Sequence, residues 1–273
     1  MSLRPHPLSN GFCWTDRPLE GLRALSRAEV SQYNREGYCV LEGAIGADEV
    51  AAVMGEIDAI EQRIESTTFT FDDAEPIAFR ADDMTFAVDL VGRAPGVEAL
   101  CRSALFAGIV HDLVGDDARL YWNQAVYKKP QKGRVFPWHQ DNGYSFTEPQ
   151  TYLTRWIPLT PATLDNGCPW IVPAIHRLGT LAHESAEAGL QIAGADFEGA
   201  ARAVEVAPGD IVLFSSLTPH RTGANLTQAV RKVLILQFAP DGLVRVLPDG
   251  SKTAQRDPLR NILILKDGKA PPD

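Results

Sequence analysis

The sequence predicts a mainly β fold, a sandwich or barrel, with helices packed against its outside. The first third of the chain carries apolar side chains at helical spacing. After Gly115 the pattern changes to short β-branched and aromatic runs separated by turn residues. Helices that precede a series of strands usually pack on the outside of one β core. We therefore expect a single domain over residues 1–273, in which a helix-rich part, 1–115, packs on a β core, 116–273.

The first predicted helix begins at a capping box. Ser26 is followed three residues later by Glu29, so each side chain can accept a hydrogen bond from the backbone N–H of the other residue. Gly37 can end this helix, because glycine readily adopts the left-handed conformation that commonly closes a helix. The apolar residues 38–41 that follow predict a short strand.

Two further helices are expected before Gly115. One begins near Asp48 and places apolar side chains along one face, at Val50, Val53, Met54, Ile57, Ile60 and Ile64. The other covers roughly residues 96–114. Such stripes are typical of helices that cover a hydrophobic core, so we assign them no catalytic role.

Five strands are expected in the β core. Each is a run of β-branched, aromatic and other apolar residues, and they cover residues 120–127, 153–159, 211–214, 230–238 and 261–265. A turn at Pro208-Gly209-Asp210 precedes the third of these strands. Residues 178–201 form a long, Ala- and Gly-rich connection between two strands, so we expect a lid or binding loop there.

The composition is that of an ordinary globular protein. Apolar residues make up 45% and charged residues 22% of the 273, and 26 basic against 35 acidic residues give a net charge of −9. An acidic chain is poorly suited to nucleic acid, because phosphate binding needs concentrated Lys and Arg. The apolar run at 233–236 is too short to cross a membrane, and the N-terminus lacks the apolar segment of a secretory signal. With four cysteines and no CxxC pair, we expect reduced thiols and a cytoplasmic location.

Three residues form a candidate metal site. On a strand, His139 and Asp141 would point to the same side, because alternate residues share a face. His220 follows the strand that begins at Ile211 and adds a second imidazole. Two histidines and one carboxylate are the facial triad of non-haem Fe(II) oxygenases, which leaves further positions on the metal open.

Arg231 lies eleven residues beyond His220, on the next predicted strand. The open metal positions can take a bidentate 2-oxo acid and then O₂, and the far carboxylate of such an acid needs a partner of its own. Arg231 offers a planar donor fork for this carboxylate. The hydroxyl of Thr222 could add a hydrogen bond to the same group.

This set of residues resembles the phytanoyl-CoA dioxygenase family of Fe(II)/2-oxoglutarate-dependent oxygenases. The resemblance covers roughly residues 25–239 and is specific as a set. Besides the residues above, it rests on Glu36-Gly37-Tyr38, Lys129-Pro130, Pro137-Trp138, Trp156, Pro158, Asn166-Gly167-Cys168, Val172-Pro173 and His176. It implies a double-stranded β-helix, a jelly-roll or cupin-like sandwich with the iron inside one end.

The resemblance implies the metal ligands directly. His139, Asp141 and His220 match the iron ligands of the family. Halogenating members of this group lack the carboxylate ligand, because chloride takes its place. The presence of Asp141 therefore argues against halogenation.

The resemblance also implies how 2-oxoglutarate is held. Arg231 and Thr222 match the groups that bind its distal carboxylate, although the family usually has Ser at the position of Thr222. Gln124 and Trp156 fall where the family places further contacts to this cosubstrate. The family commonly has Pro-Gly-Ser-His where this chain has Pro173-Ala174-Ile175-His176, which weakens any inference of the substrate from close relatives.

The expected activity is that of a non-haem dioxygenase. Fe(II), 2-oxoglutarate and O₂ would oxidise an unactivated C–H bond of a small, mostly apolar organic substrate, with release of succinate and CO₂. The same ligands could instead hold a non-redox metal such as Zn²⁺ in a jelly-roll hydrolase or isomerase, or belong to a non-catalytic binder. Arg231 favours the oxygenase over a non-redox site, and the complete ligand set argues against a binder. The partner is therefore a small molecule, neither nucleic acid nor membrane is expected, and the residues predict no oligomeric state.

Candidate substrate contacts flank the mouth of the predicted site, at Phe79, Arg80, Phe86, Asn142, Tyr144 and Phe146. A nearby basic run either binds a substrate phosphate, such as that of a CoA ester, or forms a solvated hairpin loop; it consists of Lys128, Lys129, Lys132 and Arg134. His176 is expected near the site in a structural role.

Overall fold

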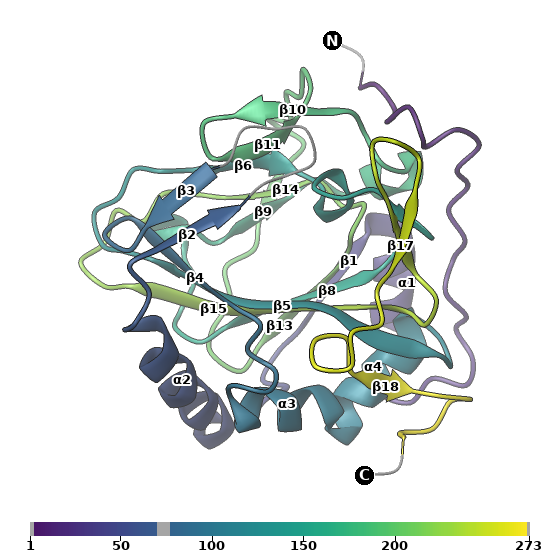
Figure 1. The fold of residues 1–273 in the computed structure, drawn as a ribbon, viewed down its shortest axis with the longest axis horizontal. Coiled ribbons are helices and arrows are strands. Elements are labelled where there is room, and N and C mark those ends of the chain that lie inside the picture. Colours follow the sequence, from purple (N-terminus) through teal and green to yellow (C-terminus); the bar gives the residue numbers. More distant parts are fainter. Residues whose placement is uncertain (1–2, 70–76, 272–273) are drawn as a thin grey trace.

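A computed structural model describes residues 3–69 and 77–271 of the chain. Within these residues two antiparallel β-sheets lie opposite each other, and helices cover the outer face of the larger sheet (Figure 1). This arrangement confirms the predicted fold class, a mainly β, jelly-roll-like core with flanking helices.

The larger sheet contains the strands that the sequence predicted at 38–41, 120–127, 153–159, 211–214, 230–238 and 261–265. In the described part of the chain it has seven antiparallel strands: β1 (Tyr38–Leu41), β13 (Ile211–Ser215), β8 (Leu153–Pro158), β15 (Arg231–Pro240), β5 (Ala118–Lys128) and β18 (Leu263–Leu265) in spatial order, with β4 (Met84–Val88) also paired to β5. Most of these strands are buried on both faces. That is why they are visible in the sequence as continuous apolar runs.

The part expected to be helix-rich also contributes strands that the sequence analysis did not predict. Strand β4 pairs with β5 from Met84 opposite Lys128 to Val88 opposite Gln124. A strand of five residues has little pattern of its own. It is stabilised by a partner that lies about 40 residues later in the chain, and local periodicity cannot reveal that pairing.

The smaller sheet brings two predicted ligands together. Its antiparallel strands are short: β12 (Arg202–Ala203), β9 (Pro169–Ile171), β14 (His220–Thr222) and β6 (Phe136–His139). In the pairing of β14 with β6, His220 is the direct neighbour of His139. Two residues that lie 81 positions apart in the sequence are therefore adjacent in the sheet.

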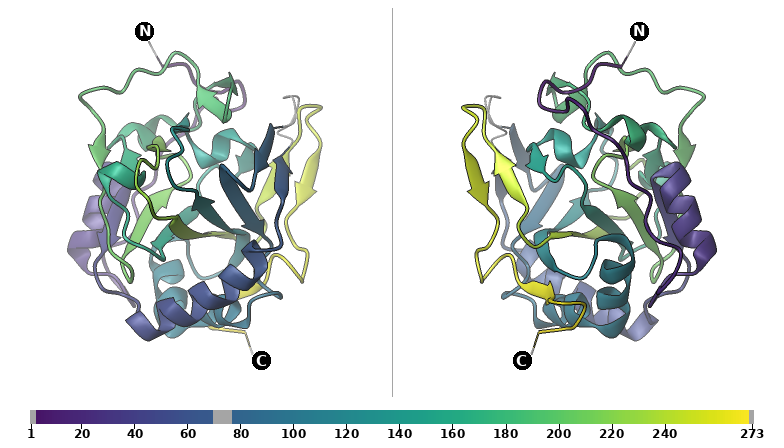
Figure 2. Two further views of the ribbon diagram at one scale, coloured as in Figure 1. Left: turned by 90° about the vertical axis from the view of Figure 1, so that its left-hand side faces the viewer. Right: turned by 90° about the vertical axis from the view of Figure 1, so that its right-hand side faces the viewer.

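Three small ribbons surround the two main sheets. They are β2 (Ser66–Phe69) with β3 (Ile77–Arg80), β10 (His183–Ala186) with β11 (Gly189–Ile192), and β7 (Thr147–Glu148) with β16 (Val244–Val246) and β17 (Lys252–Ala254). Residues 178–201, expected as a lid or binding loop, contain the β10–β11 hairpin, which lies at the top of Figure 1. The C-terminal strands β16 and β17 stand along one flank of the molecule (Figure 2).

Four α-helices occur in the described residues: α1 (Arg27–Glu36), α2 (Ala47–Glu61), α3 (Pro95–Arg102) and α4 (Ala104–Leu113). Helices α2, α3 and α4 lie beneath the larger sheet in Figure 1. The main hydrophobic core lies between them and the sheet, where Ile57, Leu100 and Ile109 pack in one cluster with Leu213 and Leu234. Each such side chain contributes about 1.5–3 kcal/mol on burial.

Helix α1 confirms the capping prediction at both ends. The Ser26 hydroxyl accepts from the backbone N–H of Glu29 at 3.2 Å, and the Glu29 carboxylate accepts from the backbone N–H of Ser26 at 2.6 Å. Gly37 ends the helix at φ 83°. A Cβ at this position would lie 2.5 Å from the His176 ring, so close packing requires glycine as strongly as the backbone does.

The single helix predicted over 96–114 is two helices. Ser103 lies between α3 and α4 in an extended conformation, with φ −59° and ψ 152°. Its hydroxyl accepts a hydrogen bond from the backbone N–H of Phe106 at 3.3 Å and so starts the second helix. Serine competes for backbone donors in this way, which makes it a helix boundary that apolar periodicity overlooks.

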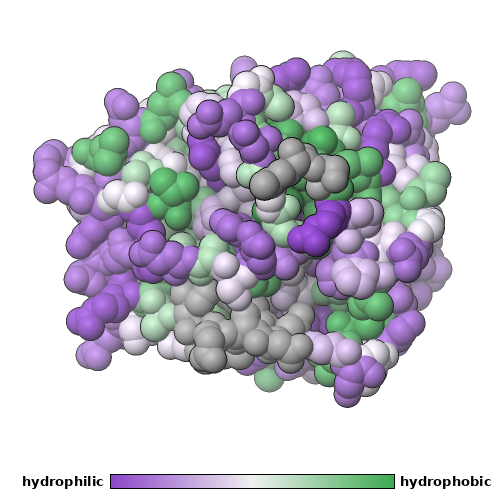
Figure 3. Space-filling view, turned by 90° about the horizontal axis from the view of Figure 1, so that it is seen from above, coloured by the Kyte–Doolittle hydropathy of each residue, from purple (hydrophilic) through white to green (hydrophobic). Residues whose placement is uncertain are grey.

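One face of the molecule is mostly polar. The face seen from above in Figure 3 is largely hydrophilic, with hydrophobic side chains in small groups. In the described ranges no helix has the length and apolar character that a membrane span requires.

Candidate metal centre

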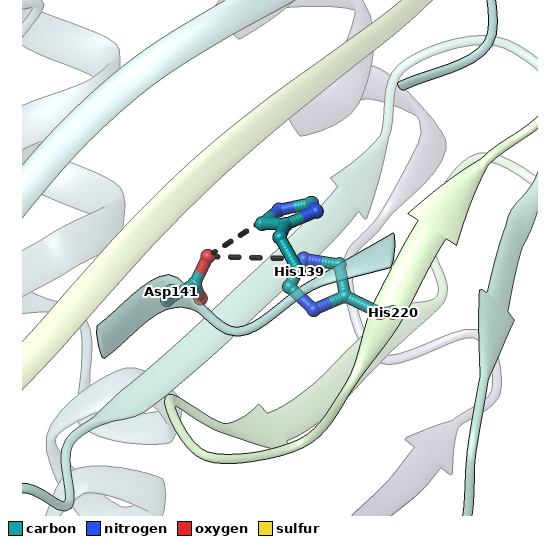
Figure 4. Close-up of side chains that lie close together, drawn as sticks. All are labelled: His139, Asp141 and His220. Carbon is teal, nitrogen blue, oxygen red and sulfur yellow. Dashed lines mark ion pairs between the residues drawn. The ribbon is translucent and has the colours of Figure 1, made fainter. Parts of the chain in front are cut away.

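Three side chains point to one centre (Figure 4). His139 is the last residue of β6, Asp141 begins the 3₁₀ helix η1 (Asp141–Gly143), and His220 begins β14. Asp141 Oδ1 lies 4.0 Å from His139 Nε2 and 3.7 Å from His220 Nε2. Ligand atoms of the three residues all lie within 4.8 Å of one another. An ion held by all three would draw them closer together, since metal bonds to imidazole and carboxylate are about 2.0–2.2 Å long.

Asp141 reaches this centre by a turn, not by strand alternation as the sequence analysis assumed. Strand β6 ends at His139, and the next residue is Gln140, whose fully buried side chain holds the turn. The Gln140 amide donates to the carbonyls of Gly179 at 2.9 Å and Leu217 at 2.6 Å, and its oxygen accepts from the N–H of Leu181 at 2.7 Å. The turn is therefore fixed by contacts with distant segments, which spacing alone does not predict.

Both imidazoles direct Nε2 to the centre. His139 Nδ1 lies 2.8 Å from the carbonyl of Pro137, and His220 Nδ1 lies 3.0 Å from that of Thr218. A carbonyl only accepts, so each Nδ1 donates its proton there and each Nε2 is the nitrogen that faces the centre. Burial, and then the neighbouring His220, hold the pKa of His139 well below its ordinary value. The neutral imidazole that results is the form that binds a metal ion.

The carboxylate has a partner that the sequence analysis missed. Thr154, on β8 and almost fully buried, donates its hydroxyl proton to Asp141 Oδ2 at 2.5 Å. Alternation along β8 places Thr154 on the same face as Trp156, which was predicted to line the site. This alternation is the signal that could have identified Thr154.

Arg231 presents a buried cation to the same region. It is the first residue of β15, is 1% exposed, and lies 5.4 Å from the centre of the Trp156 ring. Its Nε and Nη1 have no hydrogen-bond partner among the described residues. Burial lowers the pKa of Arg231 to about 10, so the guanidinium remains charged at neutral pH. A buried charge without an anionic partner is costly, and this donor set fits a carboxylate supplied from outside the chain.

The ligands and Arg231 border one cavity of about 270 Å³. The other residues predicted to contact the cosubstrate, Thr222, Gln124 and Trp156, also line it. The donor set of two imidazoles and one carboxylate suits Fe(II), and the cavity leaves room beside it for a chelating acid. The residues present therefore fit the metal and cosubstrate that the sequence predicted.

An aromatic wall forms part of the cavity. Of the predicted substrate contacts, Phe79, Phe86 and Tyr144 line it, together with Phe136, which the sequence analysis did not single out. The ring centres of Phe79 and Phe86 are 4.6 Å apart, and those of Phe136 and Tyr144 are 6.3 Å apart. This wall offers apolar surface to a ligand and keeps water away from it.

The other three predicted substrate contacts are not among the lining residues. Arg80 is exposed to solvent. Asn142 is fully buried and donates its amide to Thr180 Oγ1 at 2.6 Å, so it supports η1. Phe146 is buried and stacks on His6 with ring centres 4.8 Å apart. Asn142, Tyr144 and Phe146 all lie close to Asp141 in the sequence, but only Tyr144 lines the cavity. Sequence position alone did not show which of these side chains face the cavity.

Further lining residues come from segments that the sequence analysis did not assign to the site. Gln237 lines the cavity from β15, at a position that strand alternation could have indicated, and Tyr152 lines it from the residue before β8. Arg245 of β16 and Gln255, after β17, line it from the C-terminal ribbon. They lie beyond the region in which the sequence resembles the family, and only the folded chain brings them to the site.

Three of the four residues in the basic run at 128–134 have internal side-chain partners. Lys128 is 3% exposed, and its ammonium donates to backbone carbonyls. Lys129 pairs with Glu61, and Arg134 pairs with Asp83 at 2.9 Å. These three residues are thus neither a solvated loop nor a row of charges open to phosphate.

His176 lies outside the cavity lining, in a packed position between the N-terminal segment and α1. Its ring edge meets Trp14 with ring centres 4.3 Å apart, and its Nε2 lies 3.2 Å from the carbonyl of Asn34. Burial lowers the pKa of His176 to about 4. These contacts correspond to the structural role expected of it.

Known proteins share both the sequence pattern and the fold. The sequence profile of a family described as Phytanoyl-CoA dioxygenase (PhyH) matches residues 33–233. A phytanoyl-CoA dioxygenase of Arabidopsis thaliana is 23% identical over 188 residues, which are 57% of this chain and 66% of that protein. A probable phytanoyl-CoA dioxygenase of Caenorhabditis elegans is 27% identical over 231 residues, 80% of this chain and 70% of that protein. The chain thus spans about two thirds of the length of these relatives.

A solved structure with a similar fold is the epimerase SnoN in complex with Fe3+, alpha ketoglutarate and nogalamycin RO. It superposes with a TM-score of 0.70 at 20% identity and covers 87% of this chain and 97% of its own. At this identity the likeness concerns the fold, and the chemistry has to be argued from the site.

Proposed function

The chain belongs to the phytanoyl-CoA dioxygenase family, and from this premise we propose that it hydroxylates an unactivated C–H bond of a small, mostly apolar organic molecule. It is an Fe(II)- and 2-oxoglutarate-dependent dioxygenase. One observation carries the assignment of its site: three ligand atoms and a buried guanidinium without an anionic partner border the same cavity.

We assign the iron to His139, Asp141 and His220. The two imidazoles are oriented by backbone carbonyls, and the carboxylate supplies one negative charge. When bound there, Fe(II) supplies the redox chemistry that couples O₂ activation to the decarboxylation of 2-oxoglutarate to succinate and CO₂. The protein contributes the position and the electrostatic environment of the reacting groups.

We assign the distal carboxylate of 2-oxoglutarate to Arg231, with the Thr222 hydroxyl beside it. Thr222 lies two residues after His220 on β14, so both side chains point toward the cavity. The guanidinium of Arg231 lies over the Trp156 ring, and Gln124 lines the same cavity. Because Arg231 is desolvated before the acid arrives, its bond to a carboxylate is stronger than a bond formed in water.

The shape of the cavity limits the substrate. A volume of about 270 Å³ suits a small molecule, and a CoA group would have to lie outside it. The basic residues Lys128, Lys129 and Arg134 already have internal partners, so they give little support to a CoA phosphate. The apolar wall would bind most of the substrate, and Arg245 with Gln255 would bind a polar group at its end.

Two experiments test this function. In the first, anaerobic protein with Fe(II) is titrated with 2-oxoglutarate while the weak visible charge-transfer band of a chelated 2-oxo acid is recorded. We expect the band in the wild type and in Arg155→Met, which changes an equally buried arginine that points to the opposite face of the larger sheet. We expect its loss at the same concentration in Arg231→Leu. Iron binding without a band in the wild type would instead favour a non-redox metal site.

The second experiment separates hydroxylation from other outcomes. An epimerase with a similar fold leaves epimerisation as the main alternative. A substrate that stimulates succinate formation is incubated with the enzyme and ¹⁸O₂, and the product is examined by mass spectrometry. Hydroxylation adds one labelled oxygen atom, whereas an epimer has the mass of the substrate and would overturn the proposed reaction.

A further inference from the structure

A chain of two hydrogen bonds leads from the cavity wall to the carboxylate of Asp141. The Gln237 amide lies 3.2 Å from Thr154 Oγ1, and the Thr154 hydroxyl lies 2.5 Å from Asp141 Oδ2. Gln237 on β15 and Thr154 on β8 are direct cross-strand partners, and both line the cavity. The three groups form a continuous polar contact inside an otherwise largely apolar core.

The direction of this chain follows from the number of protons available. A carboxylate only accepts, so the single proton of the Thr154 hydroxyl must point to Asp141. The threonine oxygen is then left as an acceptor, and the Gln237 amide N–H donates to it. Each group therefore has one orientation that satisfies its neighbour.

The two oxygens of the carboxylate consequently have different surroundings. Oδ2 receives the proton of Thr154, whereas Oδ1 is the oxygen that lies nearest to both imidazole nitrogens. Of the side-chain groups that the structure describes, Thr154 gives this carboxylate its hydrogen bond. Removing that bond would free the carboxylate to rotate about its side-chain torsions.

We propose that Thr154 and Gln237 are positioning residues that hold Asp141 with Oδ1 directed at the metal, Gln237 acting only through Thr154. This inference rests on the proposed ligand set and adds two residues to it. Its chemical reason is that a preorganised ligand has already lost the rotational freedom that a loose ligand must lose when the ion binds. Both residues face the cavity, so a substrate that contacts Gln237 would also influence the metal ligand.

The test measures binding of Co(II), which gives visible absorption bands and requires no turnover. Co(II) titrations are made with the wild type, Thr154→Val, Thr154→Ser, Gln237→Leu and the double variant Thr154→Val/Gln237→Leu. We expect a Kd about 10–100-fold higher in Thr154→Val, because loss of an outer-shell partner usually has this effect. Thr154→Ser keeps the hydroxyl and should restore both the affinity and the band positions.

The double variant tests whether Gln237 acts on Asp141 only through Thr154. We call this chain of two hydrogen bonds the relay. Gln237→Leu should raise the Kd by about three- to tenfold in the wild-type background and have no further effect in Thr154→Val, since Gln237 would act through the missing hydroxyl. An equal effect of Gln237→Leu in both backgrounds, or a wild-type Kd and spectrum in Thr154→Val, overturns the proposal. If Thr154→Val does not fold by circular dichroism, Gln237→Leu alone decides, and a wild-type Kd in it overturns the relay.

Asp141→Ala separates this inference from the proposed function. A normal Co(II) Kd in Asp141→Ala would mean that the ligand set is wrong, whatever the relay variants do. Loss of Co(II) binding in Asp141→Ala together with unchanged binding in Thr154→Val leaves the ligand set intact and overturns the relay only. Neither result depends on whether the enzyme hydroxylates or epimerises its substrate.

Discussion

The two faces of the larger sheet each bury an arginine, and the two side chains have opposite surroundings. Arg155 on β8 points to the helices, whereas Arg231 on β15 points to the cavity. Both are at most 1% exposed, and both have two guanidinium nitrogens without a hydrogen-bond partner in the described ranges. Burial lowers the pKa of Arg155 to about 9 and that of Arg231 to about 10.

The neighbours of each arginine show which one belongs to a site. Arg155 lies over the rings of Phe106 and Phe238, at 4.3 and 4.2 Å from their centres, and donates to the Phe106 carbonyl at 2.6 Å. Arg231 has one aromatic neighbour, at 5.4 Å, and an open cavity beside it. An unpartnered buried nitrogen is thus insufficient to indicate a ligand site, and access from a cavity is the property that distinguishes the two.

The largest expected effect is the loss of activity when a metal ligand on the cavity side of the sheet is removed. Asp141→Ala should lower kcat for succinate formation by about 10³-fold or more, because loss of an outer-shell partner alone costs about 10–100-fold and this change removes a ligand. The free energy of unfolding should remain near that of the wild type, since Asp141 lies outside the main core. Steady-state kinetics and urea denaturation measure the two quantities, and wild-type turnover would remove Asp141 from the ligand set.

Arg155→Ala should lower stability and leave cosubstrate binding nearly unchanged. Truncating this large buried side chain should lower the free energy of unfolding by about 3 kcal/mol, since it leaves a cavity between α4 and the sheet. The KM for 2-oxoglutarate should stay within about twofold of the wild type. Arg155→Met, which keeps most of the volume, is the matched control and should recover much of the stability. A strongly raised KM in a folded Arg155→Ala protein would contradict the separation of the two faces.

Arg231→Leu should change cosubstrate binding with little loss of stability. Removing a charge-assisted bond costs about 1.5–3 kcal/mol, so the KM for 2-oxoglutarate should rise by about 10–100-fold. Replacing an unpaired buried charge by an apolar side chain should leave the free energy of unfolding unchanged or raise it. An unchanged KM would place the carboxylate anchor elsewhere.

The smallest expected effect is on the pH dependence of stability, and it comes from the buried histidine His176. Burial lowers the pKa of His176 from the ordinary value near 6.5 to about 4. Between these values the unfolded chain binds a proton that the folded protein does not, so stability is fully present above pH 6.5 and declines as the pH falls toward 4. From pH 7 to pH 5 this histidine should contribute a loss of about 2 kcal/mol. Urea denaturation at both pH values should show a correspondingly smaller decline in His176→Gln, and equal declines would contradict the assignment.

Whether the sequence predicted a helix or strand depended on where in the chain the residues that stabilise it lie. Helix α1 was predictable at both ends because Ser26, Glu29 and Gly37 act within the helix itself. The strands of the larger sheet were predictable because burial on both faces requires continuous apolar runs. The strands of the smaller sheet, two to four residues long, and the break between α3 and α4 were missed, because neither leaves a periodic pattern.

Within the site, the sequence by itself determined the kinds of residue available: His139, Asp141 and His220 as donors and Arg231 as a cation at a characteristic spacing. The tertiary structure decided which groups support them. Gln140 fixes the turn before Asp141, Thr154 orients its carboxylate, and the C-terminal ribbon carries Arg245 to the cavity. Ligand chemistry depends on residue type and can be read locally. Orientation depends on hydrogen bonds between segments far apart in the chain, and only folding brings those segments into contact.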